Sequence, residues 1–170
     1  MITSDSFVLT GLSQQGTAVV AAAVAKFARK RDVIALSGDL GAGKTVFAKA
    51  FIRSLTNENE DVPSPTFTLV QIYDACQGKQ PLTIWHFDLY RLKTPEEIYE
   101  TGFEEALSEG VSLIEWSERA GNLLPKNRLT VHLDAPAGQP EKRNITLTAN
   151  GTDWCQRMEK IKKCLNDWNF

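Results

Sequence analysis

The sequence predicts an α/β protein: a single domain in which helices flank a mixed, mostly parallel β-sheet that also contains antiparallel strand pairs. Short apolar runs alternate with amphipathic stretches along the chain, and a glycine-rich segment joins one such run to one such stretch. The chain of 170 residues has the length of one domain and is long enough to bury a core. We therefore expect one domain over residues 1–170.

Apolar periodicity divides the chain into expected strands and helices. Strand-like runs occupy residues 7–9, 33–37, 67–73, 82–88, 111–115, 128–133 and 143–148. Helices are expected from the capping residue Ser13 toward Lys30, and then at 46–55, 95–101, 103–109 and about 152–168. This alternation favours layers of helix packed on sheet.

Two pairs of neighbouring strands are expected to be antiparallel. Residues 74–81 have the composition of a turn, so 67–73 and 82–88 are predicted to pair through an eight-residue connection. Residues 128–133 and 143–148 alternate in the manner of a second hairpin. A purely parallel sheet is therefore not expected.

Residues 38–45 read Gly-Asp-Leu-Gly-Ala-Gly-Lys-Thr, a complete G-x-x-x-x-G-K-[ST] phosphate loop between a strand-like run and an amphipathic helix. Its glycines let main-chain N–H groups curl around a phosphate at the positive end of the helix dipole. Lys44 is expected to reach the β- and γ-phosphates, and Thr45 offers a hydroxyl oxygen of the kind that Mg²⁺ prefers. The alternative, a glycine-rich turn that only caps a helix, is disfavoured by both flanks.

The sequence therefore predicts a P-loop NTPase-like domain that binds a nucleoside triphosphate with Mg²⁺. The residues of the loop and of the following helix that are expected to contact the nucleotide are Gly41, Ala42, Gly43, Lys44, Thr45 and Val46.

Two acids that close strand-like runs are the candidate catalytic residues. Asp88 follows the apolar run 82–87, and Glu115 follows the run 111–114. A nucleoside triphosphatase needs a carboxylate near Mg²⁺ and a group that positions the attacking water, and such acids lie at the carboxyl ends of neighbouring strands. The residues alone leave open which of the two acids is the metal ligand.

Four other residues are weaker candidates. Thr66 lies in a loop that is able to bring its hydroxyl to the γ-phosphate, although a plain proline turn accounts for it equally well. Trp116 either contacts the nucleotide or packs against its neighbours, and packing is the commoner role. His86 and His132 have no partner at ligand or nucleophile spacing, so we interpret both as structural.

Composition and charge are those of an ordinary globular protein. Apolar residues make up 42% of the chain, and 19 basic against 21 acidic residues give a net charge of −2. The chain has no run of five like charges, so the sequence gives no support for direct nucleic-acid binding. The cysteines, Cys76, Cys155 and Cys164, lack C-x-x-C spacing, so we expect reduced thiols.

The N-terminal segment 1–6 lacks the features of a signal peptide, and the apolar run 19–25 is too short to span a bilayer. We therefore expect a cytoplasmic protein without a membrane partner.

Four segments together resemble the TsaE (formerly YjeE) proteins of bacteria. They are the loop 38–45, Ser-Pro-Thr-Phe-Thr-Leu-Val at 64–70, His-Phe-Asp-Leu-Tyr-Arg-Leu at 86–92, and Glu-Trp at 115–116. Their order and spacing also match, and the resemblance covers about residues 7–148. The D-x-x-G and [NT]-K-x-D patterns of guanine-specific GTPases and the L-S-G-G-Q pattern of transporter ATPases do not occur, so adenine is the preferred base.

The resemblance implies a small ATPase, weak without partners, that is required to form N6-threonylcarbamoyladenosine at position 37 of tRNAs reading ANN codons. Its cofactors would be ATP and Mg²⁺. Its partners would be the TsaD and TsaB proteins, and tRNA would be reached only through that complex.

The resemblance also implies roles for individual residues. Lys44 and Thr45 would contact phosphate and Mg²⁺, Glu115 would be a magnesium ligand, Asp88 would be required for hydrolysis, and Trp116 would lie beside the nucleotide. Thr66 would belong to a switch-like loop. Val46 stands where the family often has a second threonine, so one hydroxyl is lost. The helix after Asn150 matches little of the family pattern.

Two other functions use the same loop. A small-molecule kinase needs an acceptor site and usually a basic lid, and Arg91, Arg119 and Arg128 are scattered singly rather than grouped. A nucleotide-dependent binding switch differs from the ATPase only in its slow turnover, and the sequence does not separate the two.

Overall fold

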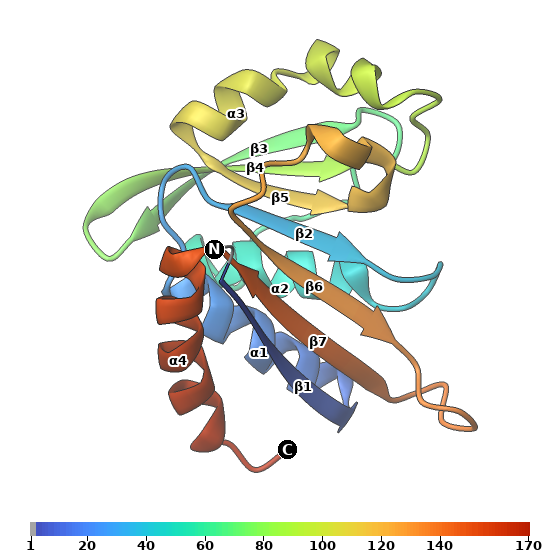
Figure 1. The fold of residues 1–170 in the computed structure, drawn as a ribbon, viewed down its shortest axis with the longest axis vertical. Coiled ribbons are helices and arrows are strands. Elements are labelled where there is room, and N and C mark those ends of the chain that lie inside the picture. The colour runs from blue at the N-terminus through green and yellow to red at the C-terminus, as the bar shows by residue number, and fades with distance from the viewer. Residues whose placement is uncertain (1–2) are drawn as a thin grey trace.

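The computed structural model describes residues 3–170, and within them a seven-stranded mixed sheet runs through the molecule in the order β1-β7-β6-β2-β5-β4-β3 (Figure 1). Residues 1 and 2, which belong to the expected domain and to the segment considered for a signal peptide, lie outside the described part. In the described part no helix is long and apolar enough to cross a membrane.

The strands and helices have the following bounds. The strands are β1 (Ser4–Leu12), β2 (Val33–Ser37), β3 (Val70–Gln77), β4 (Gln80–Asp88), β5 (Val111–Glu115), β6 (Arg128–Asp134) and β7 (Arg143–Asn150). The α-helices are α1 (Gln14–Lys26), α2 (Lys44–Leu55), α3 (Phe103–Glu109) and α4 (Thr152–Asn166), and the 3-10 helices are η1 (Pro95–Thr101) and η2 (Ser117–Leu123).

Parallel pairing is confined to the middle of the sheet. β2 pairs in parallel with β5 and with β6, and β4 pairs in parallel with β5. β1 with β7, β6 with β7, and β3 with β4 are antiparallel. The expectation of a mixed sheet is confirmed, but the expectation of a mostly parallel one was wrong: each margin is built from antiparallel pairs, which need no crossover helix.

The β3–β4 hairpin is tighter than the sequence suggested. Residues 74–77 continue β3 rather than forming a turn, and Gln77 pairs with Gln80 across Gly78 and Lys79. Gly78 takes a φ of +61°, which a short hairpin turn requires and glycine adopts at little cost. Pro81 lies in β4 before that strand begins to pair with β5 at Ile84, so its missing N–H leaves no gap there.

The central strands are apolar on both faces because helices cover both. Ile34 and Leu36 of β2 belong to one core cluster, which α1, α2 and α4 complete. Val33 of the same strand belongs to a second cluster, with residues of η1, α3 and η2. This alternation follows the period of two along a strand. The glycine-rich loop 38–43 therefore leaves a strand that is buried on both sides.

Several helix boundaries differ from the prediction. Ser13 caps α1 as expected, its Oγ accepting from the N–H of Gly16 at 3.0 Å. α1 ends at Lys26 rather than near Lys30, because Ala28–Asp32 turns back toward β2 and the N–H of Arg29 donates to Asp32 Oδ2 at 2.6 Å. The expected helix at 95–101 is a 3-10 helix, and Trp168 lies beyond α4 rather than in its buried stripe.

A buried ion pair fixes α4, the helix that matches little of the family pattern, to the rest of the fold. Arg157 is 2% exposed, and its guanidinium donates to both carboxylate oxygens of Asp32 at 2.6 and 2.8 Å. It also donates to the carbonyl oxygen of Phe27 at 2.8 Å. The pair joins α4 to the turn that leads into β2, the strand that carries the glycine-rich loop.

Replacing Asp32 with alanine leaves the Arg157 guanidinium buried with fewer partners, so Asp32→Ala is expected to lower the free energy of unfolding by about 3 kcal/mol. Urea denaturation measures this. The control is Asp5→Ala, which removes the partner of Lys162 in a pair whose side chains are 23% and 32% exposed, and which should cost less than about 1 kcal/mol. Equal losses in the two variants would refute the assigned role of the Asp32–Arg157 pair.

Candidate functional site

The glycine-rich loop leaves the carboxyl end of β2 and opens α2. Gly38, Gly41 and Gly43 take φ values of +137°, +78° and +105°, which residues with a Cβ rarely adopt. A Cβ at Gly38 would also overlap the carbonyl oxygen of Leu133 on β6. Gly43 is the N-cap of α2 and offers no side-chain cap, so the first N–H groups of the helix remain free for a ligand.

Lys44 lies folded back on the glycine-rich loop. Its Nζ donates to the carbonyl oxygens of Gly38 and Asp39 at 2.6 and 2.8 Å, and it lies 3.8 Å from the ring centroid of Trp116. Burial of the ammonium group lowers the pKa of Lys44 below its ordinary value, and this effect exceeds the opposing influence of nearby carboxylates, Glu115 foremost. The loop carbonyls thus hold the Lys44 ammonium group, which burial has partly removed from water.

Glu115 lies at the end of β5 and joins two other elements. One carboxylate oxygen accepts from Thr45 Oγ1 of α2 at 2.7 Å, and the other lies 2.6 Å from Nε2 of His86 on β4. Glu115 is 1% exposed and His86 is fully buried. Among residues 3–170 Nδ1 of His86 has no partner, and a ring that carries a proton on Nε2 donates it to Glu115.

Asp88 lies beside Glu115, since the two residues are paired in the parallel register of β4 and β5. Its Oδ2 accepts from Ser64 Oγ at 2.9 Å and from Thr66 Oγ1 at 3.2 Å, and its Oδ1 accepts from the N–H of Tyr90 at 3.0 Å. The carboxylate is 4% exposed. Asp88 therefore ties the loop before β3 to the same edge of the sheet.

Trp116 stands over this group of residues. It follows Glu115 with a left-handed backbone, φ 55° and ψ 43°, which turns the chain sharply at the start of η2. Its ring lies 4.8 Å from that of Tyr90, centroid to centroid. Trp116 thus forms one wall of the site, and Lys44 packs against its face.

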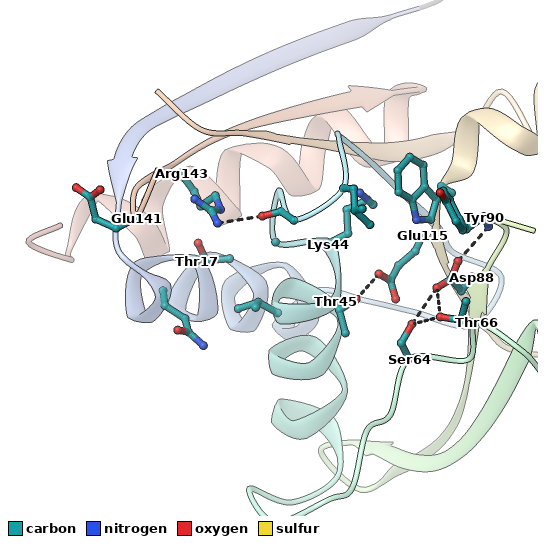
Figure 2. Close-up of a pocket in the computed structure, with 16 residues that line it drawn as sticks. Thr17, Lys44, Thr45, Ser64, Thr66, Asp88, Tyr90, Glu115, Glu141 and Arg143 are labelled. Atoms are coloured by element: carbon teal, nitrogen blue, oxygen red, sulfur yellow. Dashed lines mark hydrogen bonds between the residues drawn. The ribbon is translucent and has the colours of Figure 1, made fainter. Parts of the chain in front are cut away.

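A cavity of about 410 Å³ collects these groups (Figure 2). Eight of the nine residues predicted to be catalytic or to bind nucleotide or metal line it, namely Gly41, Gly43, Lys44, Thr45, Val46, Asp88, Glu115 and Trp116. Thr66, a weaker candidate, also lines it. Ala42 does not line it; its side chain is buried in the core. Within residues 3–170 no three acidic, histidine or cysteine side chains cluster as a ready-made metal site.

Other residues in or beside the cavity were not predicted to be functional. His86 was interpreted as structural and without a partner, yet it contacts Glu115 from the neighbouring strand. Ser64 and Tyr90 each lie two residues from a predicted residue, Thr66 and Asp88, so the sequence offered a local signal for both. Thr17 and Arg143 also line the cavity, but they are far from the motifs along the chain and only the fold brings them there. His132 has a partner as well, Ser37 Oγ at 2.9 Å, at an exposed position.

Fold and site together define a single-domain α/β protein with a glycine-rich loop, a lysine and two buried acids at one edge of its sheet. The family model of the threonylcarbamoyl adenosine biosynthesis protein TsaE matches residues 12–145. The chain belongs to the TsaE family.

Relatives named tRNA threonylcarbamoyladenosine biosynthesis protein TsaE support this assignment. One from Rickettsia conorii is 47% identical over 72% of this chain and 68% of its own length. One from Bacillus subtilis is 37% identical over 89% of this chain and 91% of its own. The crystal structure of YdiB from Bacillus subtilis superposes with a TM-score of 0.71 at 29% identity, over 96% of this chain and 97% of that one. The resemblance of the four motifs to TsaE is thereby confirmed.

Because burial lowers the pKa of Lys44, its ammonium group should lose its proton at a lower pH than the exposed lysines do. The folded state then holds this proton less tightly than the unfolded state, so the contribution of Lys44 to the free energy of unfolding should rise with pH between the two pKa values. NMR titration of ¹³Cε-labelled lysine measures the pKa, and Lys44→Met identifies the signal. A Lys44 signal that titrates with or above the exposed lysines would contradict the expectation.

Proposed function

We propose that this chain binds ATP with Mg²⁺ at the glycine-rich loop and hydrolyses it in support of N6-threonylcarbamoyladenosine formation on tRNA. The observation that carries the proposal is the convergence of the loop, Thr45, Asp88 and Glu115 on one cavity at the carboxyl ends of parallel strands. Ligands of open α/β sheets bind at this edge. The names of the relatives supply the biological process.

The glycine-rich loop suits a chain of phosphates. The N–H groups at the start of α2 have no side-chain cap, and the helix dipole adds positive potential there. Lys44 brings a full positive charge to the same place. Its present partners are uncharged carbonyl oxygens, so an anionic phosphate would be a stronger partner for the ammonium group. We propose that Lys44 turns from the loop carbonyls to the β- and γ-phosphates when nucleotide binds.

The pair of Thr45 and Glu115 fits a magnesium ion, which prefers oxygen ligands and usually keeps several waters beside one or two protein ligands and the phosphates. The hydroxyl of Thr45 and the carboxylate of Glu115 are already 2.7 Å apart. His86 fixes the other oxygen of Glu115 and thereby orients the carboxylate. Bound Mg²⁺ would neutralise charge that develops on the phosphates during hydrolysis.

Asp88 is proposed to act on the attacking water. It lies next to Glu115 in the sheet, and its carboxylate is fixed by Ser64, Thr66 and the N–H of Tyr90. A carboxylate held in this way is able to accept a hydrogen bond from water and orient it toward the γ-phosphate. Because Asp88 also holds the loop 64–66, that loop is suited to respond to the terminal phosphate.

We further propose that the chain acts with the TsaD and TsaB proteins, the partners that the family resemblance implies. ATP hydrolysis is then expected to be weak in the isolated chain and to rise in their presence. The test is phosphate release from Mg²⁺-ATP by the chain alone and with a TsaB–TsaD pair, with small-molecule acceptors absent. Partner-dependent release supports the proposal; tight ATP binding without release under either condition would favour a binding switch instead.

Lys44→Ala and Asp88→Asn should separate binding from hydrolysis. Lys44→Ala removes the charge that holds the phosphates, so ATP affinity should fall at least about tenfold. Asp88→Asn should leave affinity within a few-fold and lower kcat about 100-fold, since it removes the group that orients water. Calorimetry measures affinity and phosphate release measures kcat.

Asp134→Asn is the matched control for Asp88→Asn, because Asp134 is an exposed acid at the end of β6 on the same sheet. Its kcat should stay at the wild-type value. Wild-type kcat in Asp88→Asn would refute the role of Asp88, and unchanged affinity in Lys44→Ala would refute that of Lys44.

Glu115→Gln should raise the Mg²⁺ concentration that half-saturates hydrolysis by roughly tenfold or more, because it removes a charged oxygen ligand. A magnesium titration of phosphate release at fixed ATP measures this. Glu118→Gln is the control, since Glu118 is an exposed acid three residues further along the chain. An unchanged titration in Glu115→Gln would move the metal role away from Glu115.

A further inference from the structure

A second hollow, separate from the cavity at the glycine-rich loop, lies between α1 and the C-terminal end of α4. The two helices contact each other and share one core cluster (Figure 1). They run in opposite directions, because the ring of Phe170 approaches Gly16 near the start of α1, whereas Arg157 donates to the carbonyl oxygen of Phe27 just after its end. The hollow between them measures about 540 Å³, and we call it the α1–α4 groove.

The floor of the α1–α4 groove is apolar. The α1 residues that form it are small or branched and none of them is fully buried, namely Ala18, Val19, Ala22 and Ala23. Between Ser13 and Lys26 the sequence of α1 has no charged residue. A surface helix of a globular protein normally presents charged or polar side chains on its outer face. The outer face of α1 is therefore suited to contact with another protein surface.

An exposed indole stands at the rim of the α1–α4 groove. Trp168 lies just beyond α4, lines the groove and is 52% exposed. Exposed tryptophan is enriched at protein interfaces, where it often contributes much of the binding energy. The groove has the volume of a pocket that accepts a small molecule, about 300–1,000 Å³, so it is large enough for an indole ring. The same face thus carries a projecting aromatic group and a hollow of a size to receive one.

The rim also carries two opposite charges that do not pair with each other. Lys26 and Asp167 both line the groove, and both are exposed. Among residues 3–170 the one hydrogen-bond partner of Lys26 Nζ is the sulfur of Cys164 at 3.9 Å, and neither Lys26 nor Asp167 belongs to an ion pair. Both charges are therefore available to a second surface.

A second copy of this chain is complementary to this face. In a two-fold interface the same patch lies on both subunits, so each contact occurs twice with the roles exchanged. Such an axis would bring Lys26 of one copy to Asp167 of the other, and would offer each Trp168 to the groove of the other copy. An acidic protein or a nucleic acid would attract Lys26 but repel Asp167, so it fits the face less well.

We propose that the α1–α4 groove is the contact surface of a two-fold symmetric dimer of this chain. Lys26 and Asp167 pair between the subunits, and Trp168 is the aromatic anchor. The inference does not depend on the proposed nucleotide binding. It assigns a role to the C-terminal end of α4, the helix that matches little of the family pattern.

Analytical ultracentrifugation of the full chain over a concentration series, without nucleotide, tests the proposal. The mass of the wild type should rise with concentration from 18.9 kDa, the mass of one chain, to twice that value. Trp168→Ala should raise the Kd of the dimer at least about tenfold, because it removes the anchor. Trp168 is half exposed and lies beyond α4, so this change should leave the fold of the monomer intact.

Charge reversal tests the pairing between the subunits. Lys26→Glu and Asp167→Lys, each alone, place like charges opposite one another and should each raise the Kd at least about fivefold. The variant with both changes restores opposite charges and should recover most of the wild-type affinity. Lys79→Glu makes the same change in the exposed turn between β3 and β4, away from the groove, and should dimerise like the wild type.

Three outcomes would overturn the proposal. A wild-type chain that stays monomeric up to about 1 mM would exclude the dimer and leave the groove to a different partner. A dimer whose Kd is unchanged in Trp168→Ala and in both single charge variants would have its contact surface elsewhere. Weaker dimers in both single charge variants, without recovery when the changes are combined, would refute the pairing of Lys26 with Asp167.

Discussion

The parallel pairing of β5 with both β2 and β4 is the constraint on which the site depends. Because the carboxyl ends of parallel strands meet at one edge, the register places Glu115 beside Leu36 at the end of β2 and beside Asp88 at the end of β4. β2 then continues directly into the glycine-rich loop. Helices on both faces make this arrangement stable, since β2, β4 and β5 each bury apolar side chains in two core clusters. The polar groups of the site are therefore held in place by strands whose side chains are packed into an apolar core.

The polar groups of the cavity differ in how fully the chain satisfies them. At the end that we propose for the phosphates each one has an internal partner: Lys44 has loop carbonyls, Glu115 has Thr45 and His86, and Asp88 has two hydroxyls and an N–H. At the other end Thr17 Oγ1 has none among residues 3–170. The internal bonds keep the charged groups in place without a ligand, so binding exchanges one set of partners for another rather than ordering a loose site. The Thr17 hydroxyl has no such internal hydrogen bond that a ligand would replace.

Much of the fold was predictable because its signals are local. The central strand 33–37, the cap at Ser13 and the hairpin of β6 with β7 follow from periodicity and from capping chemistry. The turn predicted at 74–81 shows the limit of local signals. Pro81 suggests a break in the strand, and only the pairing of β4 shows that this position needs no sheet hydrogen bond on the side of β5. The balance of parallel and antiparallel pairs likewise depends on which strands become neighbours, and no single segment of the sequence predicts its neighbours in the sheet.

Local patterns in the sequence predicted the family, the glycine-rich loop with Lys44 and Thr45, and the two strand-end acids, because each of these is a short pattern whose chemistry depends on adjacent residues. The folded chain was needed to show that His86 contacts Glu115, that Asp88 holds the loop 64–66, and that Thr17 and Arg143 line the same cavity. These contacts join segments that the sheet order and the packing of α1 bring together. The physical reason is that a hydrogen bond or an unpaired buried hydroxyl is a property of two surfaces in contact, and the second surface is known only once the chain has folded.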